Sequence, residues 1–334
     1  MLIKLLSYVG LIIALLAGLI YWMQSPQAHV PEWIHNGKHS PEGPLPSKVN
    51  LMTYNIGFAS GPNQRQHKPQ EIKANLTHII EQVRTHEVDI LCVQEIDIQS
   101  NRSGKINQIQ YIRHNGPLPH VAIAITWNHH WVPYPYHLNP QRHFGPTIAA
   151  QAIFSRWPIH EQTIQTFIKP KNQHPLYQLF YLNRLAQLIK TGPSKEESIQ
   201  IANVHLEAFD RKTREIQAQK LAHFLQRHQK GPLIVAGDFN AIPETLNNDQ
   251  FYPDEPKVNY GKDRTLPLLL THPKLKLNNV HTDASFTFPS NNPNRQLDYC
   301  LYSPHFQVTG HHILVSTHKA SDHLPILATF QHPQ

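Results

Sequence analysis

The feature that most constrains the fold is a pattern that occurs five times, an apolar β-rich run that ends in a polar side chain. The clearest example is the run 88–93, which is apolar at nearly every position and leads into Gln94 and Glu95. A strand that is apolar on both faces is typical of the centre of a sheet covered by other layers. The pattern therefore predicts stacked layers with polar residues at the strand ends.

The last of these runs indicates what the polar ends could do. Asp322 and His323 stand side by side where a loop enters the final strand, 324–330. Metal-assisted hydrolysis at phosphorus needs such a pair, a carboxylate to hold a hard cation and an imidazole to handle a proton or the developing charge. The residues at the five ends are Asn55, Glu95, His205, Asp238 with Asn240, and Asp322 with His323. They would converge if the strand ends share one rim.

Each of these residues also has an ordinary structural interpretation, which stays open at this level. Asn55 can simply turn the chain, and Asp238 can belong to a tight turn. Glu95 can be a solvated strand end, and His205 can be a packing residue. Asp298 is harder to explain in this way, because it lies inside an apolar strand pattern and a buried carboxylate needs a partner.

The remaining periodicity predicts many strands and two clear helices. Strands are predicted at 49–56, 121–127, 148–154, 185–189, 199–204, 233–236 and 296–302. Helices are predicted at 71–88 and 211–228, the second with Ile216, Leu221, Phe224 and Leu225 on its apolar face. The loop 128–145 is long and rich in aromatic residues, proline and histidine, which makes it a candidate rim for a substrate site. We expect stacked β-sheets with helices on their outer faces.

The amino-terminal segment, residues 1–23, is predicted to anchor the chain in a membrane. Its run from Leu5 to Met23 has no charged residue, and about 20 apolar residues are needed to span the hydrocarbon layer. A cleaved signal segment is the alternative, but Pro26-Gln27-Ala28 is a poor cleavage site, so an uncleaved anchor is favoured. Lys4 precedes the run, and the positive-inside bias then leaves the rest of the chain on the extracytoplasmic, periplasmic side. Cleavage would make the protein secreted.

Residues 24–47 contain five prolines and are predicted to form an extended tether, so that the catalytic domain covers 48–334. The formal charge of the 334 residues is +7, which permits an anionic partner, but Lys and Arg are scattered rather than clustered. The two cysteines, Cys92 and Cys300, lie in apolar strands and form neither a disulfide framework nor a zinc pattern. No protein partner is indicated.

Six short motifs together resemble the endonuclease/exonuclease/phosphatase superfamily of phosphate-ester hydrolases. The resemblance covers residues 48–330, and the order of the motifs along the chain is what makes it specific. The motifs are Tyr54-Asn55, Gln94-Glu95, Asn203-Val204-His205-Leu206, Gly237-Asp238-Phe239-Asn240, Leu297-Asp298-Tyr299 and Ser321-Asp322-His323.

The resemblance implies an α/β fold, a four-layer α/β/β/α sandwich of two mixed β-sheets flanked by helices, here preceded by one transmembrane helix. It also implies cleavage of a phosphate ester by activated water with Mg²⁺ as the cofactor and Mn²⁺ as the alternative. Glu95 would be the main metal carboxylate, with Asn55 and Asp322 positioning the metal or its waters. Magnesium takes few carboxylates and keeps several waters, so a sparse ligand set is expected.

The remaining motif residues would be catalytic or would bind the substrate. Asp238 would orient or deprotonate the attacking water, and Asn240 would fix the phosphate. His323, held by Asp298, would act as general base or stabilise phosphoryl charge, and which of Asp238 and His323 is the base stays open. His205 would contact a phosphate oxygen. Arg184 could clamp phosphate or be a surface residue.

One position departs from part of the superfamily. Some nucleases carry a carboxylate two positions after the first asparagine, where this chain has Gly57. The number of metal ions, one or two, therefore stays open. The segment 203–219 is more similar to the sphingomyelinase-like and bacterial branch than to the abasic-site endonucleases.

The favoured function is a membrane-tethered, metal-dependent phosphodiesterase. The anchor and the aromatic loop favour a lipid head group or another small phosphodiester as the substrate. The net charge also suits a nuclease, because phosphate neutralisation supplies most non-specific affinity for nucleic acid. A membrane-bound pseudoenzyme that only binds its ligand is the alternative from another class, and the presence of the whole set of acidic residues argues against it.

Overall fold

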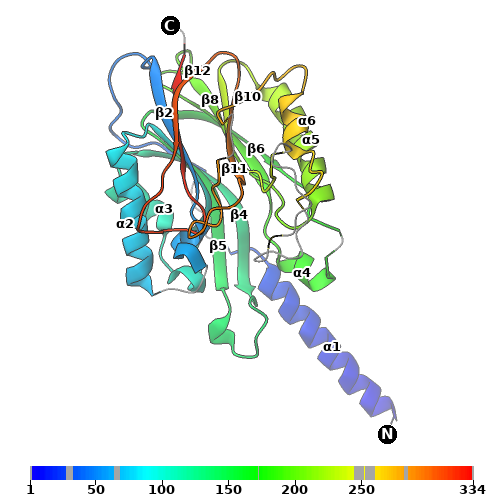
Figure 1. Cartoon of the computed structure of the whole chain (residues 1–334). Helices are drawn as coiled ribbons and strands as arrows, with labels where there is room; N and C mark the ends of the chain where they lie inside the picture. The colour runs from blue at the N-terminus through cyan, green and yellow to red at the C-terminus, as the bar shows by residue number, and fades with distance from the viewer. Residues whose placement is uncertain are drawn as a thin grey trace.

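Two β-sheets packed face to face form the centre of the computed structural model (Figure 1). The structure describes residues 2–27, 33–63, 68–171, 173–243, 252, 260–281 and 285–332. Helices cover the outer face of each sheet, so the layers run helix, sheet, sheet, helix. The predicted four-layer α/β sandwich, with one apolar helix before it, is confirmed.

The first sheet contains seven strands in the described part of the chain. Its central pair, β2 and β3, is parallel, and its other neighbours are antiparallel. In spatial order the strands are β1 (Ile34–His35), β4 (His120–Val132), β5 (Gly145–Ser155), β3 (Ile90–Gln99), β2 (Lys48–Asn55), β13 (Ile326–Gln331) and β12 (Gln307–Ile313).

The second sheet contains six strands among the described residues, and its parallel pair is β8 and β9. In order they are β10 (Asn278–Asn279), β11 (Asp298–Tyr302), β9 (Leu233–Asp238), β8 (Ile199–His205), β7 (Leu185–Thr191) and β6 (Ile159–Thr166). The predicted hairpin at 185–204 corresponds to β7 and β8, which pair antiparallel.

The core between the sheets follows from the alternation of side chains along each strand. Leu51 and Cys92 point into the layer between the sheets, whereas Met52 and Leu91 point to the helices outside. Because both faces of β2 and β3 are covered, apolar residues occupy consecutive positions, as the run 88–93 predicts. Cys300 of the second sheet lies in the same inner layer, and both thiols are buried.

Two helices cover each sheet. The first sheet packs against α2 (Pro69–Thr85) and α3 (Gln108–Asn115), and the second against α5 (Arg211–His228) and α6 (Thr265–Leu270). Helix α5 has the predicted bounds, and α2 ends three residues before the predicted end at 88. The short helices α3, α4 (Pro175–Phe180) and α6 were not predicted, because fewer than three turns leave little periodicity to detect.

The prediction for the buried face of α5 was wrong at Ile216, which is 42% exposed. Arg214 and Gln217 are buried instead. The Arg214 guanidinium donates to the carboxylate of Asp263 at 2.6 Å and to the carbonyl of Glu207 at 2.8 Å. These contacts satisfy the buried charge, so the helix turns a partly polar face to the sheet.

One polar cluster interrupts the apolar layer between the sheets. The side-chain amide of Asn203 donates to the carbonyls of Val93 and Ala152 at 3.0 and 3.1 Å, and its oxygen accepts from Gln94 at 2.6 Å. Gln151 donates to the backbone carbonyl of Asn203 at 2.7 Å. These bonds tie β8 to β3 and β5 at the point where the β3–β5 register shifts.

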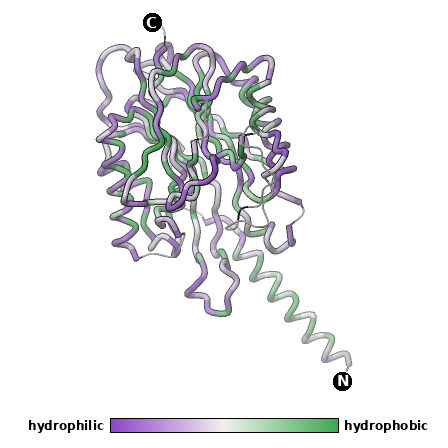
Figure 2. Tube along the Cα trace, viewed as in Figure 1, coloured by the Kyte–Doolittle hydropathy of each residue, from purple (hydrophilic) through white to green (hydrophobic). Residues whose placement is uncertain are grey.

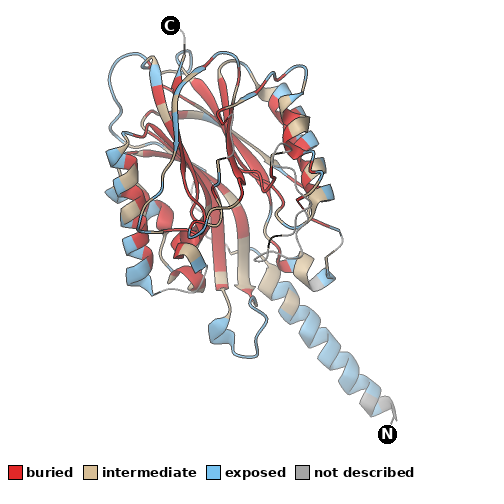
Figure 3. Cartoon of the chain, in the orientation of Figure 1, coloured by how far each residue is buried: buried red, intermediate tan, exposed pale blue. Residues whose placement is uncertain are grey.

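Helix α1 (Leu2–Gln24) extends away from the body of the molecule, and most of its described side chains are exposed (Figures 1 and 3). Hydrophobic colours recur along the helix in Figure 2. The stretch Leu6–Gln24 is long and apolar enough to cross a membrane, and a signal sequence would have the same character.

The predicted tether, 24–47, is attached to the body at more than one point. Ile34 and His35 form β1, which pairs with β4, and the backbone N–H of Gln27 donates to Asn128 at 2.8 Å. Pairing of so short a strand leaves no signal in a proline-rich sequence, so this docking was not predicted. Residues 28–32, which include Ala28 of the weak cleavage site, lie outside the described residues.

The predicted loop 128–145 is shorter in the structure, because β4 runs on to Val132 and β5 begins at Gly145. We call residues 133–144 the β4–β5 hairpin loop. It contains a single helical turn at Pro140–Arg142 and projects beyond the sheet (Figure 1).

Candidate active site

The strand register brings the predicted polar residues to one edge of the sandwich. Asn55 and Gln94 are partners in the parallel pair β2–β3, and His205 and Asp238 are partners in the parallel pair β8–β9. Parallel strands end at the same edge of a sheet, so both sheets present polar side chains there. Asp298 enters the group from β11, directly opposite Asp238.

The two sheets meet in a hydrogen-bonded group at this edge. The amide nitrogen of Asn55 lies 2.9 Å from a carboxylate oxygen of Asp238 and 3.4 Å from one of Glu95. Nε2 of His205 lies 3.5 Å from Asp238 and 3.9 Å from Glu95. Asn55 also accepts from the backbone N–H of Gly57, so it turns the chain as well as joining the site.

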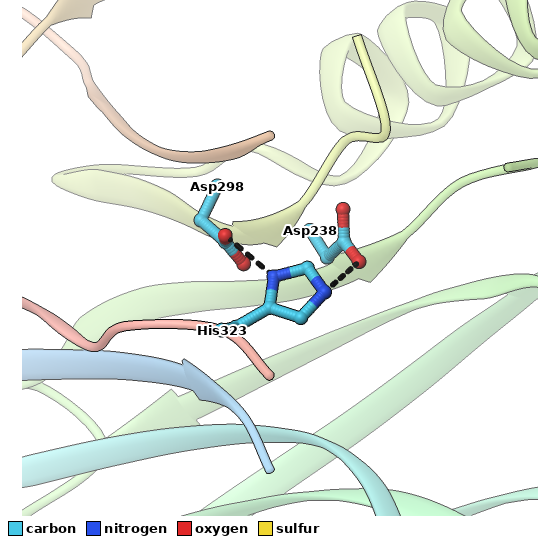
Figure 4. Close-up of side chains that lie close together, drawn as sticks. All are labelled: Asp238, Asp298 and His323. Carbon is cyan, nitrogen blue, oxygen red and sulfur yellow. Dashed lines mark hydrogen bonds and ion pairs between the residues drawn. The ribbon is translucent and has the colours of Figure 1, made fainter. Parts of the chain in front are cut away.

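His323 is held between two aspartates (Figure 4). Its Nδ1 lies 2.8 Å from a carboxylate oxygen of Asp298, and its Nε2 lies 3.8 Å from Asp238. Burial disfavours the charged ring, but the charges of Asp298, Asp238 and Asp322 hold the pKa of His323 well above its ordinary value. The phenyl ring of Phe288 packs against the imidazole with the ring centres 4.7 Å apart.

Asp238 is placed by an unusual backbone. Gly237 precedes it with φ of 145°, and a Cβ there would lie 2.0 Å from the carbonyl oxygen of Val204, so only glycine fits. Asn240 follows with φ of 51°, its N–H donates to Asp238 at 2.9 Å, and its side chain donates to Leu206 at 3.0 Å. Burial and the charge of Asp298 raise the pKa of Asp238.

Arg184 and His205 form the opposite wall of the site. The Arg184 guanidinium donates to Nε2 of His205, and its other amino group donates to the hydroxyl of Tyr181 at 3.2 Å. Burial and the charge of Arg184 lower the pKa of His205 well below its ordinary value. A neutral His205 that accepts at Nε2 has no proton to donate at that atom. The arginine is therefore the donor that faces the site.

Arg184 is buried, so its interpretation as a surface residue was wrong. The Tyr181 hydroxyl in turn donates to the carboxylate of Glu207 at 2.9 Å. Neither Tyr181 nor Glu207 was predicted as a site residue. Their pairing joins segments 26 residues apart, and no local pattern in the sequence signals it.

Glu95 and Asp322 complete the acidic part of the site. Glu95 lies at the β3 irregularity with φ of 53°, and its side chain is 21% exposed. Burial raises the pKa of Asp322 to about 6. The nearby His323 opposes this rise, and the charge of Glu95 adds to it. Ser321 donates to Asp322 at 3.1 Å and to the carbonyl of Asn55 at 2.7 Å, which joins this loop to β2.

The donor set fits a hard divalent cation. Closely placed carboxylates repel one another when buried, and a cation relieves that repulsion. Asp238, Asp298 and His323 offer ligand atoms that all lie within 4.8 Å of one another. The hydrogen bond between His323 and Asp298 already uses two of these atoms. Glu95, Asp322 and Asn55 offer side-chain oxygens, the ligand type that such an ion prefers.

A cavity of about 360 Å³ lies over these residues. Its floor is polar and includes Glu95, Arg184, His205, Asp238, Asn240, Asp322 and His323. Its walls are aromatic and include Trp127, Tyr134, Tyr136, Phe144, Tyr177, Phe180 and Tyr181. Tyr134, Tyr136 and Phe144 belong to the β4–β5 hairpin loop, so the segment expected to rim the site does line the cavity.

All the predicted site residues meet at this edge. Most of them line the cavity, whereas Asn55 and Asp298 lie behind it and hold Asp238 and His323. Their chemical roles stay predictions.

Comparison with known proteins gives a consistent result. The sequence model described as the Endonuclease/Exonuclease/phosphatase family matches residues 52–323. A search of curated proteins found no significant match.

Solved structures share the fold. An endonuclease/exonuclease/phosphatase from Beutenbergia cavernae has a TM-score of 0.61 at 15% identity, covering 85% of this chain and 72% of its own. The human Nocturnin catalytic domain with bound sulfate has a TM-score of 0.56 at 20% identity, covering 86% and 94%. A mannosyl-6-phosphatase from Bacteroides thetaiotaomicron has a TM-score of 0.54 at 16% identity, covering 84% and 99%. At these identities the likeness concerns the fold.

Proposed function

The chain belongs to the endonuclease/exonuclease/phosphatase family, and we propose that it is a metal-dependent phosphodiesterase acting on a lipid head group or another small phosphodiester. The observation that carries this proposal is the Asp298–His323–Asp238 group at the floor of an aromatic-walled cavity. Membership of the family implies hydrolysis of a phosphoric ester. The metal, the substrate and the residue roles are the proposed part.

Asp298 and His323 prepare an imidazole for proton transfer. The Asp298 carboxylate accepts from Nδ1, which directs the other ring nitrogen toward Asp238. A carboxylate in this position sets the tautomer of the imidazole and stabilises its charged form. Nε2 and the Asp238 oxygen are 3.8 Å apart, too far for a direct hydrogen bond and suitable for a water that both groups contact.

We place the attacking water between these two groups. Asp238 takes its proton as general base, because a charged His323 has no lone pair to accept it, and His323 holds the water through Nε2. The raised pKa of Asp238 brings a carboxylate closer to the basicity that proton abstraction near neutral pH requires. Asn55 and the backbone N–H of Asn240 keep Asp238 in place.

Glu95, with Asn55 and Asp322, would hold a divalent cation, Mg²⁺ with Mn²⁺ as the alternative. The ion when bound supplies positive charge at the phosphate and the leaving oxygen. Arg184 supplies fixed positive charge from the other wall, and Tyr181 and Glu207 orient its guanidinium. Asn240 borders the cavity where a phosphate oxygen would lie. His205 supports Arg184 by accepting its hydrogen bond at Nε2.

The substrate class rests on the cavity walls and on α1. Aromatic walls bind an apolar or carbohydrate group next to the phosphate, and α1 has the length and composition of a membrane anchor. We place the domain on the extracytoplasmic side, because the one charged residue at the start of α1 is Lys4. A carboxyl-terminal reporter that is active only in the cytoplasm would contradict this placement.

The deciding assay measures hydrolysis by the full chain in detergent, with Mg²⁺ and with a chelator. Sphingomyelin, a phosphoinositide and plasmid DNA are tested in parallel. We expect Mg²⁺-dependent release of a lipid head group, abolished by Glu95→Ala and by His323→Ala with the fold retained. If plasmid DNA were nicked and no lipid were cleaved, the proposed substrate would be nucleic acid instead of a lipid. Activity that survives both substitutions would refute the site, and silence on every substrate would favour a pseudoenzyme.

A further inference from the structure

Helix α1 is attached to β4, and this attachment fixes where a membrane would lie. The carbonyl of Gln24 accepts from Nδ1 of His129 at 2.7 Å, and Ser25 lies 3.0 Å from Nδ1 of His130. The ring of Trp22 stacks on that of His130 with the ring centres 5.6 Å apart. The candidate span itself ends at Gln24. The segment after the span is docked on β4 and is not a flexible linker, so in an anchored protein β4 at His129 would lie at the bilayer surface.

The β4–β5 hairpin loop continues from that point toward the membrane. After His129, β4 runs on to Val132 before the loop begins. Three strand residues add about 10 Å, and the head-group layer on each side of a bilayer is only about 5–8 Å thick. Figure 1 shows α1 and the hairpin loop projecting from the same end of the body, opposite the carboxyl terminus. A loop in this place has to enter the head-group layer.

The composition of the loop suits that layer. Leu138 at its tip is fully exposed, and Tyr136 and Tyr134 are 57% and 47% exposed. Most of the loop has hydrophilic colours in Figure 2, and Phe144 is its other large apolar residue, a mixture that suits the interface and not the hydrocarbon interior. Arg142 adds a positive charge, and no Asp or Glu occurs anywhere from residue 98 to 160. The loop therefore presents aromatic and basic groups without a carboxylate that anionic lipids would repel.

We propose that the β4–β5 hairpin loop is a second membrane-contact element, inserted into the head-group layer of the bilayer that holds α1. This inference rests on the membrane anchor in the proposed function. Tyr134 and Tyr136 also line the cavity, so the inserted loop sets the mouth of the active site at the bilayer surface. A phosphate ester of a lipid head group can then reach Asp238 and His323 while its acyl chains stay in the membrane.

The test places a fluorescent label at the loop tip of the full chain in phosphatidylcholine vesicles. Cys92 and Cys300 are buried, so a new surface cysteine can be labelled selectively. Leu138→Cys is the test position, and Leu15→Cys in α1 reports the anchor. Glu196→Cys is the matched control, because Glu196 is exposed and the turn 192–198 lies at the other end of β7 and β8 from the site. Each label is exposed to iodide in the water and to a spin-labelled lipid.

We expect the spin-labelled lipid to quench the label at position 138, and we expect iodide to quench it only weakly. Its emission maximum should lie further to the blue than that of the label at 196. The label at 196 should show the reverse. Lipid quenching at 15 without lipid quenching at 138 would overturn the hairpin inference and leave the anchor intact. No lipid quenching at 15 would overturn the anchor and this inference together. Neither result depends on hydrolysis, so failure of the proposed activity is seen separately in the substrate assay.

Discussion

The polar cluster around Asn203 should be worth several kcal/mol, and Asn203→Leu tests this. The substitution keeps the number and branching of the side-chain heavy atoms but removes its bonds to Gln94 and to the carbonyls of Val93 and Ala152. Both carbonyls would then be buried between the sheets without this donor. Gln94 keeps its bond to Thr53 at 3.1 Å, so we count only the carbonyls.

Each buried polar group left without a partner costs about 1–3 kcal/mol, so loss of this donor at two carbonyls should lower the free energy of unfolding by about 2–6 kcal/mol. Urea denaturation of the full chain in a fixed detergent, followed by tryptophan fluorescence, measures this change. The matched control is Asn50→Leu. Asn50 also bonds to a carbonyl, that of Glu87 at 3.1 Å, but at the surface, where water replaces the lost partner.

The control should lose no more than about 1 kcal/mol. Equal, small decreases in the free energy of unfolding for both variants would show that the buried hydrogen bonds of Asn203 do not stabilise the protein. A large decrease for Asn203→Leu alone would support that they do. Because Gln94 precedes Glu95, the same variant should also lower hydrolysis in the molecules that remain folded.

Three further predictions concern the site and the sheet around it. Asp298→Asn should lower kcat by about 10²–10⁴-fold with KM nearly unchanged, because a neutral amide does not stabilise the charged imidazole of His323. Steady-state kinetics measures this change, with circular dichroism as the folding control. A decrease in kcat of less than about tenfold would argue against the positioning role of Asp298. Gly237→Ala should lower the free energy of unfolding by at least about 3 kcal/mol or prevent folding, because its Cβ would meet Val204. The control is Gly231→Ala, where a Cβ has nothing within 4 Å. It should change the free energy of unfolding by less than about 0.5 kcal/mol in the same denaturation assay. Within the part of the chain that the structure describes, His281 is buried with no hydrogen-bond partner at either ring nitrogen, and burial and the nearby His311 lower its pKa to about 4. In the unfolded chain the pKa of His281 is about 6.5, so the unfolded state binds a proton there at a higher pH than the folded state does. As the pH falls from 6.5 to 4, the free energy of unfolding should therefore decrease, by at most about 3 kcal/mol. Denaturation midpoints across this range should fall less for His281→Gln, and equal slopes for the two proteins would contradict the assignment.

The elements that the sequence predicts well are those whose signal is local. The bounds of α5 follow from a periodicity of 3.6 residues, and the strand at 88–93 follows from a nearly unbroken apolar run, signals that neighbouring positions determine by themselves. Ile216 shows the limit of this reasoning. Local spacing determines where Ile216 lies around the helix, but it does not determine which face of the helix is buried. That face depends on Asp263, which binds Arg214 although it lies 49 residues further along the chain.

The docking of the segment before Lys48 has the same explanation. Prolines predict an extended chain, and the chain is extended where β1 forms. Its pairing with β4 depends on a partner 88 residues further along the chain, because Ile34 pairs with Ala122 in the strand register.

The sequence by itself determined the fold class, the family and the acidic and histidine residues of the site, because a polar residue at the end of an apolar strand can be recognised from its neighbours. Only the tertiary structure decided how these residues act on one another. The Arg184–His205 contact, the Tyr181–Glu207 support and the aromatic walls all join segments that are distant in the chain. Burial and nearby charge, which set the protonation of His205 and His323 in opposite directions, exist only once the two sheets have packed together.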